Sequence, residues 1–113
     1  MIKHKLTKYQ FIAFIQVIEI ILKNLRSRKI DMKRDNQYMQ FTAYIELLEE
    51  MSRSFRSKLV KIEHESSKHT IRFSLTAVEC LALSLYYGIC EYDPYQQATI
   101  QKIIEPIQQK LLS

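Results

Sequence analysis

Imidazole and carboxylate groups, which are common zinc ligands, collect at one place in the sequence, Glu63-His64-Glu65 followed by His69. On a helix, a zinc-binding histidine pair is four residues apart, as in His-Glu-x-x-His, whereas His64 and His69 are five residues apart and point in different directions. In a loop these side chains can converge, but a solvated polar connection is far more common. We therefore predict neither a metal site nor a bound cofactor.

Catalytic motifs that depend on glycine are excluded because the chain contains a single glycine, Gly88. A phosphate-binding loop needs several glycines, and no serine lies in a Gly-x-Ser-x-Gly sequence. The two cysteines, Cys80 and Cys90, form no Cys-x-x-Cys pair, and on one continuous helix their backbones would lie about 15 Å apart, too far for a disulfide. We interpret them as reduced structural thiols of a cytoplasmic protein, and we predict no catalytic residues and no enzymatic activity.

Basic residues are concentrated in the first third of the chain. Residues 1–34 have a net charge of +7 and residues 35–113 a net charge of −2, so the +5 of the whole chain arises near its start. One dense cluster consists of Lys23, Arg26, Arg28, Lys29, Lys33 and Arg34. Because clustered cations raise the local potential, this segment is the candidate site for nucleic-acid phosphates or for a carboxylate-rich protein surface. The alternative is that the macrodipole simply favours cations at a helix C-terminus. The three lysines near the N-terminus, Lys3, Lys5 and Lys8, are interpreted as part of a solvated tail.

Tyrosines crowd the segment that leads into the last predicted helix: Tyr86, Tyr87, Tyr92 and Tyr95. Aromatic side chains with a polar tip are enriched at protein interfaces. Tyr86 is interpreted as a packing residue, and Tyr87, Tyr92 and Tyr95 are the candidates for a protein interface. The alternative is that they pack the turn and their hydroxyls reach water.

Apolar periodicity predicts four helices, at about 7–28, 36–62, 76–88 and 94–112. All four have start signals, which are the capping boxes Thr7-x-x-Gln10 and Thr76-x-x-Glu79, the pair Asp93-Pro94, and a cap at Asp35 or Asn36 for the second helix. Gly88 is placed to end the third helix in a left-handed conformation.

The segment before the third helix has a different period. Ile71, Phe73 and Leu75 alternate with polar residues, which predicts an extended segment from Thr70 to Leu75. A β-hairpin within 58–75 is the alternative.

These elements predict a mainly α protein, an up-and-down four-helix bundle that forms a single domain over residues 1–113. The scarcity of turn formers, one glycine and two prolines, argues against a sandwich or a barrel. The apolar stretch from Phe11 to Leu22 contains Gln16 and Glu19 and falls short of the ~20 apolar residues of a membrane span. We therefore predict an amphipathic core helix and no membrane insertion.

The chain resembles bacteriocin immunity proteins in length, basic charge and predicted four-helix form, and small regulatory proteins of mobile elements share the same features. Complete helix signals without catalytic ones predict a non-enzymatic interaction or regulatory protein that binds a macromolecular partner, with a protein as the favoured partner. Binding of nucleic acid through the basic 23–34 segment is the alternative, and an immunity-like bundle is a further one. Ile12 and Ile20 lie off the main apolar face of the first helix, which is also compatible with a homodimer.

Overall fold

The computed structural model describes residues 1–30, 36–63 and 70–112. The elements follow in the order β1 (Ile2–Thr7), α1 (Lys8–Ile30), α2 (Asn36–Glu63), β2 (Thr70–Leu75), α3 (Ala77–Tyr86), a short 3-10 turn η1 (Tyr87–Ile89) and α4 (Pro94–Leu112). The predicted mainly helical fold with four helices is confirmed, and each helix ends within two residues of its predicted bounds.

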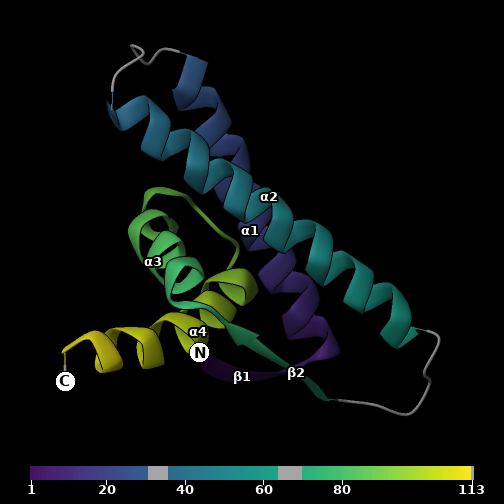
Figure 1. Ribbon diagram of the computed structural model, residues 1–113. Coiled ribbons are helices and arrows are strands. Elements are labelled where there is room, and N and C mark those ends of the chain that lie inside the picture. Colours follow the sequence, from purple (N-terminus) through teal and green to yellow (C-terminus); the bar gives the residue numbers. More distant parts are fainter. Residues whose placement is uncertain (31–35, 64–69, 113) are drawn as a thin grey trace.

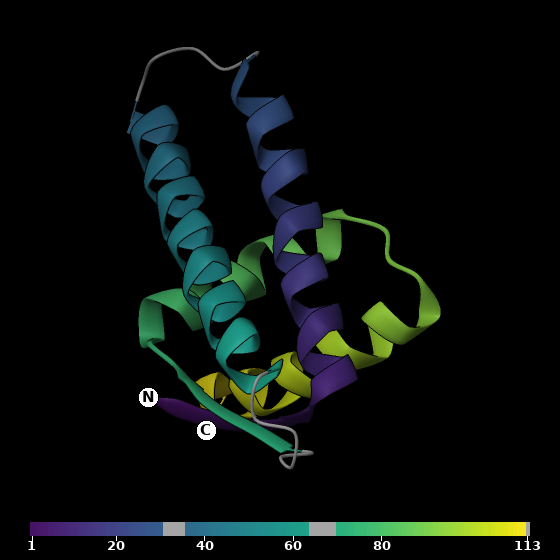
Figure 2. The same ribbon diagram turned by 90° about the vertical axis from the view of Figure 1, so that its right-hand side faces the viewer.

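The two long helices, α1 and α2, run antiparallel and side by side (Figure 1). The shorter α3 and α4 lie across one side of this pair, so that the up-and-down order holds for α1 and α2 while the last two helices cross them (Figure 2). A two-stranded sheet covers the end of the fold where α1 begins and α2 finishes (Figure 1). None of the helices in the described ranges combines the length and apolarity needed to cross a bilayer.

Strand β2 confirms the extended segment predicted from Thr70 to Leu75. Its antiparallel partner is β1, with Ile2 opposite Leu75 and Thr7 opposite Thr70. The strand pair therefore joins the two distant segments 2–7 and 70–75 and does not form within 58–75, because α2 continues to Glu63.

The interpretation of the N-terminal lysines as a solvated tail is wrong for Lys3 and Lys5, because both belong to β1. His4 and Leu6 alternate with these two lysines and are buried, which is the pattern of a half-buried strand.

Reciprocal side-chain hydrogen bonds start three of the helices. The Thr7 amide donates to Gln10 Oε1 at 3.0 Å, and the Gln10 amide donates to Thr7 Oγ1 at 3.2 Å. The same exchange joins Thr76 to Glu79, and Asp93 to Gln96. These contacts confirm the start signals predicted at Thr7, Thr76 and Asp93, whereas Asp35, one of the two caps predicted for α2, lies outside the described residues.

The predicted left-handed cap at Gly88 is wrong, because Gly88 has no positive φ. Helix α3 ends at Tyr86 and passes directly into η1, which needs no left-handed residue.

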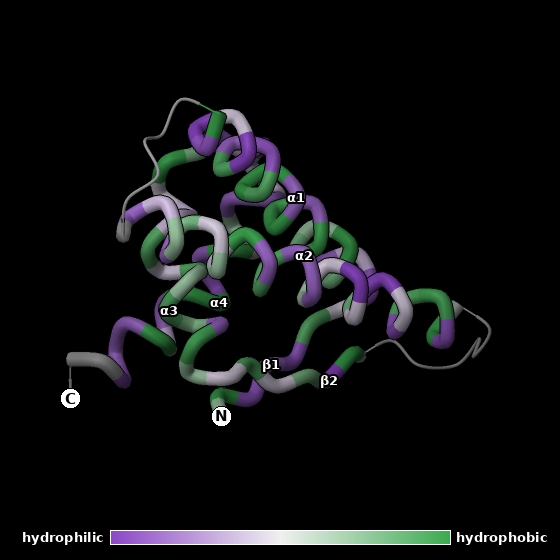
Figure 3. Tube along the Cα trace, turned by 45° about the horizontal axis from the view of Figure 1, so that its top comes forward, coloured by the Kyte–Doolittle hydropathy of each residue, from purple (hydrophilic) through white to green (hydrophobic). Residues whose placement is uncertain are grey.

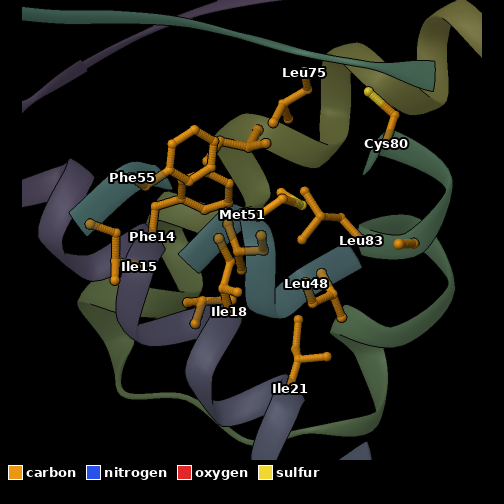
Figure 4. Close-up of a cluster of buried hydrophobic side chains, with 14 of the residues drawn as sticks. Phe14, Ile15, Ile18, Ile21, Leu48, Met51, Phe55, Leu75, Cys80 and Leu83 are labelled. Carbon is orange, nitrogen blue, oxygen red and sulfur yellow. The ribbon is translucent and has the colours of Figure 1, made fainter. Parts of the chain in front are cut away.

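The core is built around aromatic rings from three elements. Phe14 and Phe11 on α1 contact Phe55 on α2, with ring centroids 5.6 Å apart in both pairs. Phe73 on β2 lies 5.4 to 5.5 Å from each of these rings. Leu48, Met51 and Leu83 continue the core toward α3 in the close-up of Figure 4. Strand β2 is thus held to the helices by its inward side chains.

His4 lies on the inner side of β1, stacked on Phe73 at 5.4 Å, and its Nε2 atom is buried with no hydrogen-bond partner among the described residues. Burial lowers the pKa of this imidazole below its usual value of 6.5. In the unfolded chain His4 becomes protonated as the pH falls through 6.5. In the folded protein its pKa is lower, so the buried imidazole stays neutral to a lower pH. The free energy of unfolding is therefore expected to decrease as the pH falls from 7.5 to 5.5.

Replacing His4→Phe removes the buried unpaired nitrogen and keeps the stacked ring. We expect this variant to be more stable than the wild type by about 1 kcal/mol at neutral pH, because an unsatisfied buried polar group carries a cost of this order. We also expect a smaller loss of stability at pH 5.5. Urea denaturation of both proteins at the two pH values measures this, and an equal pH dependence of the two proteins would contradict the assignment to His4.

Candidate interaction surface

Helix α3 presents apolar side chains to solvent along one side. The capping box at Thr76 and Glu79 sets the phase of the helix, so that Cys80 and Leu83 are buried against the core. On the opposite side lie Val78, Leu81 and Leu85, which are 56%, 43% and 51% exposed, and Ile89 in η1 is 37% exposed. We call these four residues the α3 stripe. Their spacing of three and four residues is that of one helix face.

The α3 stripe is free of competing charge. Glu79 is the charged residue of α3, and its carboxylate accepts a hydrogen bond from the Thr76 amide at 2.8 Å. Most of the helix is coloured as hydrophobic in Figure 3. A partner that covers this face would displace water from apolar groups without stripping water from an ion, which is the favourable case for an interface core.

A cavity of about 260 Å³ opens beside Leu81. It is lined by Met1, Ile2, Leu75, Ala77, Cys80, Leu81, Ile107 and Lys110. Burial raises the pKa of the Cys80 thiol, with a smaller contribution from Glu79 nearby, so Cys80 lines the cavity as an apolar thiol at neutral pH. Lys110 contributes a cation to this otherwise largely apolar site.

The predicted basic cluster is partly engaged in contacts within the fold. Arg26 forms an ion pair with Glu49 at 3.1 Å, and the Lys29 ammonium lies 5.3 Å from the centre of the Tyr38 ring. Lys23 and Arg28 are exposed.

These four cations lie within the last eight residues of α1, at the end of the molecule away from the sheet (Figure 1). Lys33 and Arg34 lie outside the described residues, as do His64, Glu65 and His69 of the candidate metal ligands. Within the described ranges no group of three or more histidine, cysteine, aspartate or glutamate side chains is placed to hold a metal ion.

The three candidate tyrosines have different surroundings. The Tyr92 hydroxyl donates to the Tyr87 backbone carbonyl at 2.6 Å, and burial strongly raises the pKa of Tyr92. The Tyr87 hydroxyl accepts from Gln108 Nε2 at 3.3 Å, which joins η1 to α4. Tyr95 is 50% exposed at the start of α4. Tyr87 and Tyr92 therefore take part in packing the turn, and Tyr95 presents much of its ring to solvent.

The α3 stripe and its cavity are absent from the sequence-based candidates. The signal in the sequence is that residues 77–86 are apolar on nearly all sides, a pattern typical of a fully buried helix. Which side of such a helix is left uncovered depends on where its neighbours lie, and only the structure places them.

No protein-family model, curated protein sequence or solved structure matches this chain.

Proposed function

We propose that this protein is a non-enzymatic interaction protein that binds an amphipathic helix of a partner protein along the α3 stripe. The observation that carries the proposal is the exposure of Val78, Leu81 and Leu85, between 43% and 56%, on one face of a helix with a single charged residue. Contiguous apolar patches on a folded surface commonly mark such contacts.

The size of the patch favours a helix over a second whole domain. The α3 stripe spans about a dozen residues, about 16 Å along a helix axis, which matches three turns of a bound helix. Four partly exposed apolar side chains offer on the order of 300 Å², whereas a stable dimer buries about 800 Å² on each subunit. A second copy of this chain bound through the stripe alone would therefore form a weak dimer.

The cavity beside Leu81 supports a particular chemistry for the partner helix. Its volume of about 260 Å³ accommodates one large apolar side chain, and a buried anchor of this kind commonly dominates the binding energy. Lys110 at the same cavity favours an acidic residue next to that anchor. The expected ligand is a helix with apolar residues at intervals of three and four and an acidic neighbour.

Selection from a displayed library of random 16-residue peptides tests this proposal and requires no identified partner. The immobilised 113-residue chain is expected to enrich peptides with apolar residues at i, i+3 or i+4, and i+7, and with an acidic residue beside one of them. Peptides without this periodicity, or peptides that bind equally well to denatured protein, would contradict the proposal.

A further inference from the structure

The outer face of the two-stranded sheet is built from cations and hydroxyls. Side chains alternate along each strand, so every second residue of β1 and β2 points away from the core. The outward residues are Lys3, Lys5, Thr7, Thr70, Arg72 and Ser74, which we call the outer sheet face. All six side chains carry hydrogen-bond donors, and none is a carboxylate.

The register brings two of these cations directly together. Lys5 is opposite Arg72, and Lys3 is opposite Ser74. Like charges at directly opposite positions destabilise a strand pair, so this arrangement costs the fold stability. A bound anion would relieve that repulsion.

A further cation reaches the same strand from α2. The Lys58 ammonium donates a hydrogen bond to the backbone carbonyl of Arg72. A hollow of about 510 Å³ at the sheet is lined by the outward residues Lys3, Lys5, Arg72 and Ser74 and by the inward residues His4 and Phe73. Three of its six lining residues are lysine or arginine, so the hollow is a site of positive potential.

From this geometry we propose that the outer sheet face binds the phosphate backbone of single-stranded nucleic acid. The donors extend along six-residue strands, about 17 Å, which is longer than one phosphate and fits a chain of them. Because the inner face of the sheet packs on the helices, only the outer face is available to a ligand. We therefore expect the sheet to lie flat along a single nucleic-acid strand and not to enter the groove of a duplex. No aromatic or aliphatic side chain lies on the outer sheet face for base stacking or insertion into a bilayer, and binding is therefore indifferent to base sequence.

Fluorescence anisotropy with labelled 20-nucleotide oligouridylate and oligothymidylate, at 50 and 200 mM NaCl, tests this site. The variant Lys3→Gln/Lys5→Gln/Arg72→Gln removes its three cations. The matched control Lys23→Gln/Arg28→Gln/Lys102→Gln removes the same charge from exposed positions on α1 and α4. The control also tests the alternative that nucleic acid binds the basic end of α1.

We expect the sheet variant to bind both oligonucleotides at least tenfold more weakly at 50 mM NaCl, and its salt slope to fall by about 2, because three phosphate contacts are lost. The control should change affinity less than threefold. Thermal melts of both variants establish that they are folded. The single variant Lys5→Gln, with an expected fall in slope of about 0.7, serves if the triple variant is not folded.

Equal losses in the sheet variant and the control would overturn the proposal, since they would reflect net charge alone. The absence of binding at 50 mM NaCl would also overturn it. Sheet-dependent binding to phosphatidylserine vesicles without binding to either oligonucleotide would assign the surface to membranes and overturn it as well.

Discussion

Phe14→Ala is expected to lower the free energy of unfolding by about 3 to 5 kcal/mol. The Phe14 ring is fully buried, and it contacts Phe55 on α2 at 5.6 Å and Phe73 on β2 at 5.5 Å. Its removal leaves a cavity where three elements meet, and none of them can collapse into it without moving the other two. Since small domains are stable by only about 5 to 15 kcal/mol, this variant should be marginally folded.

Urea denaturation followed by circular dichroism measures this loss. Tyr9→Ala on the same helix provides the control, because the Tyr9 side chain is 74% exposed and its removal should change stability by less than about 1 kcal/mol. A loss below about 1 kcal/mol for Phe14→Ala would show that the aromatic cluster does not hold α1, α2 and β2 together.

Leu81→Glu/Leu85→Glu is expected to weaken the binding of stripe-selected peptides at least 30-fold, equivalent to about 2 kcal/mol. The substitutions remove two apolar contacts and require two carboxylates to lose water against an apolar helix. Because both leucines are about half exposed and glutamate is a good helix former, the stability of the protein itself should change by no more than about 1 kcal/mol. Loss of binding and retention of the fold are thus separable.

The matched control is Met39→Glu/Val60→Glu, which adds the same two charges at exposed apolar positions of α2. Titration calorimetry with one selected peptide should give the control an affinity within threefold of the wild type. If both double variants weaken binding equally, the added negative charge explains the effect and the α3 stripe is not the binding surface.

Local signals made the helices predictable. The helix starts at Thr7, Thr76 and Asp93 each depend on hydrogen bonds to a residue three positions away. Both partners of each hydrogen bond can therefore be recognised in one short stretch of sequence. The extended segment at 70–75 was predictable for a similar reason, because its two-residue alternation is visible along the chain.

Interactions between distant residues were not predictable from the sequence. The pairing of Lys5 with Arg72 joins residues far apart along the chain. The six-residue segment 2–7 contains no local pattern that indicates which other segment it pairs with. The sequence therefore does not predict the outer sheet face, although it contains the lysines that form part of it. For the same reason, the apolar character of Leu81 and Leu85 did not reveal that their side of α3 is uncovered.

Binding of a partner helix along the α3 stripe is tested most directly by nuclear magnetic resonance. Backbone amide chemical shifts are recorded while a stripe-selected peptide is titrated into the isotope-labelled 113-residue chain. Binding at the α3 stripe predicts that the largest shifts fall in residues 77–89 and in the neighbours Leu75 and Ile107 that line the cavity. Largest shifts at Arg26 and Arg28, or at Lys3 and Lys5, would contradict it, because they would place the peptide on a basic surface and leave the α3 stripe without a ligand.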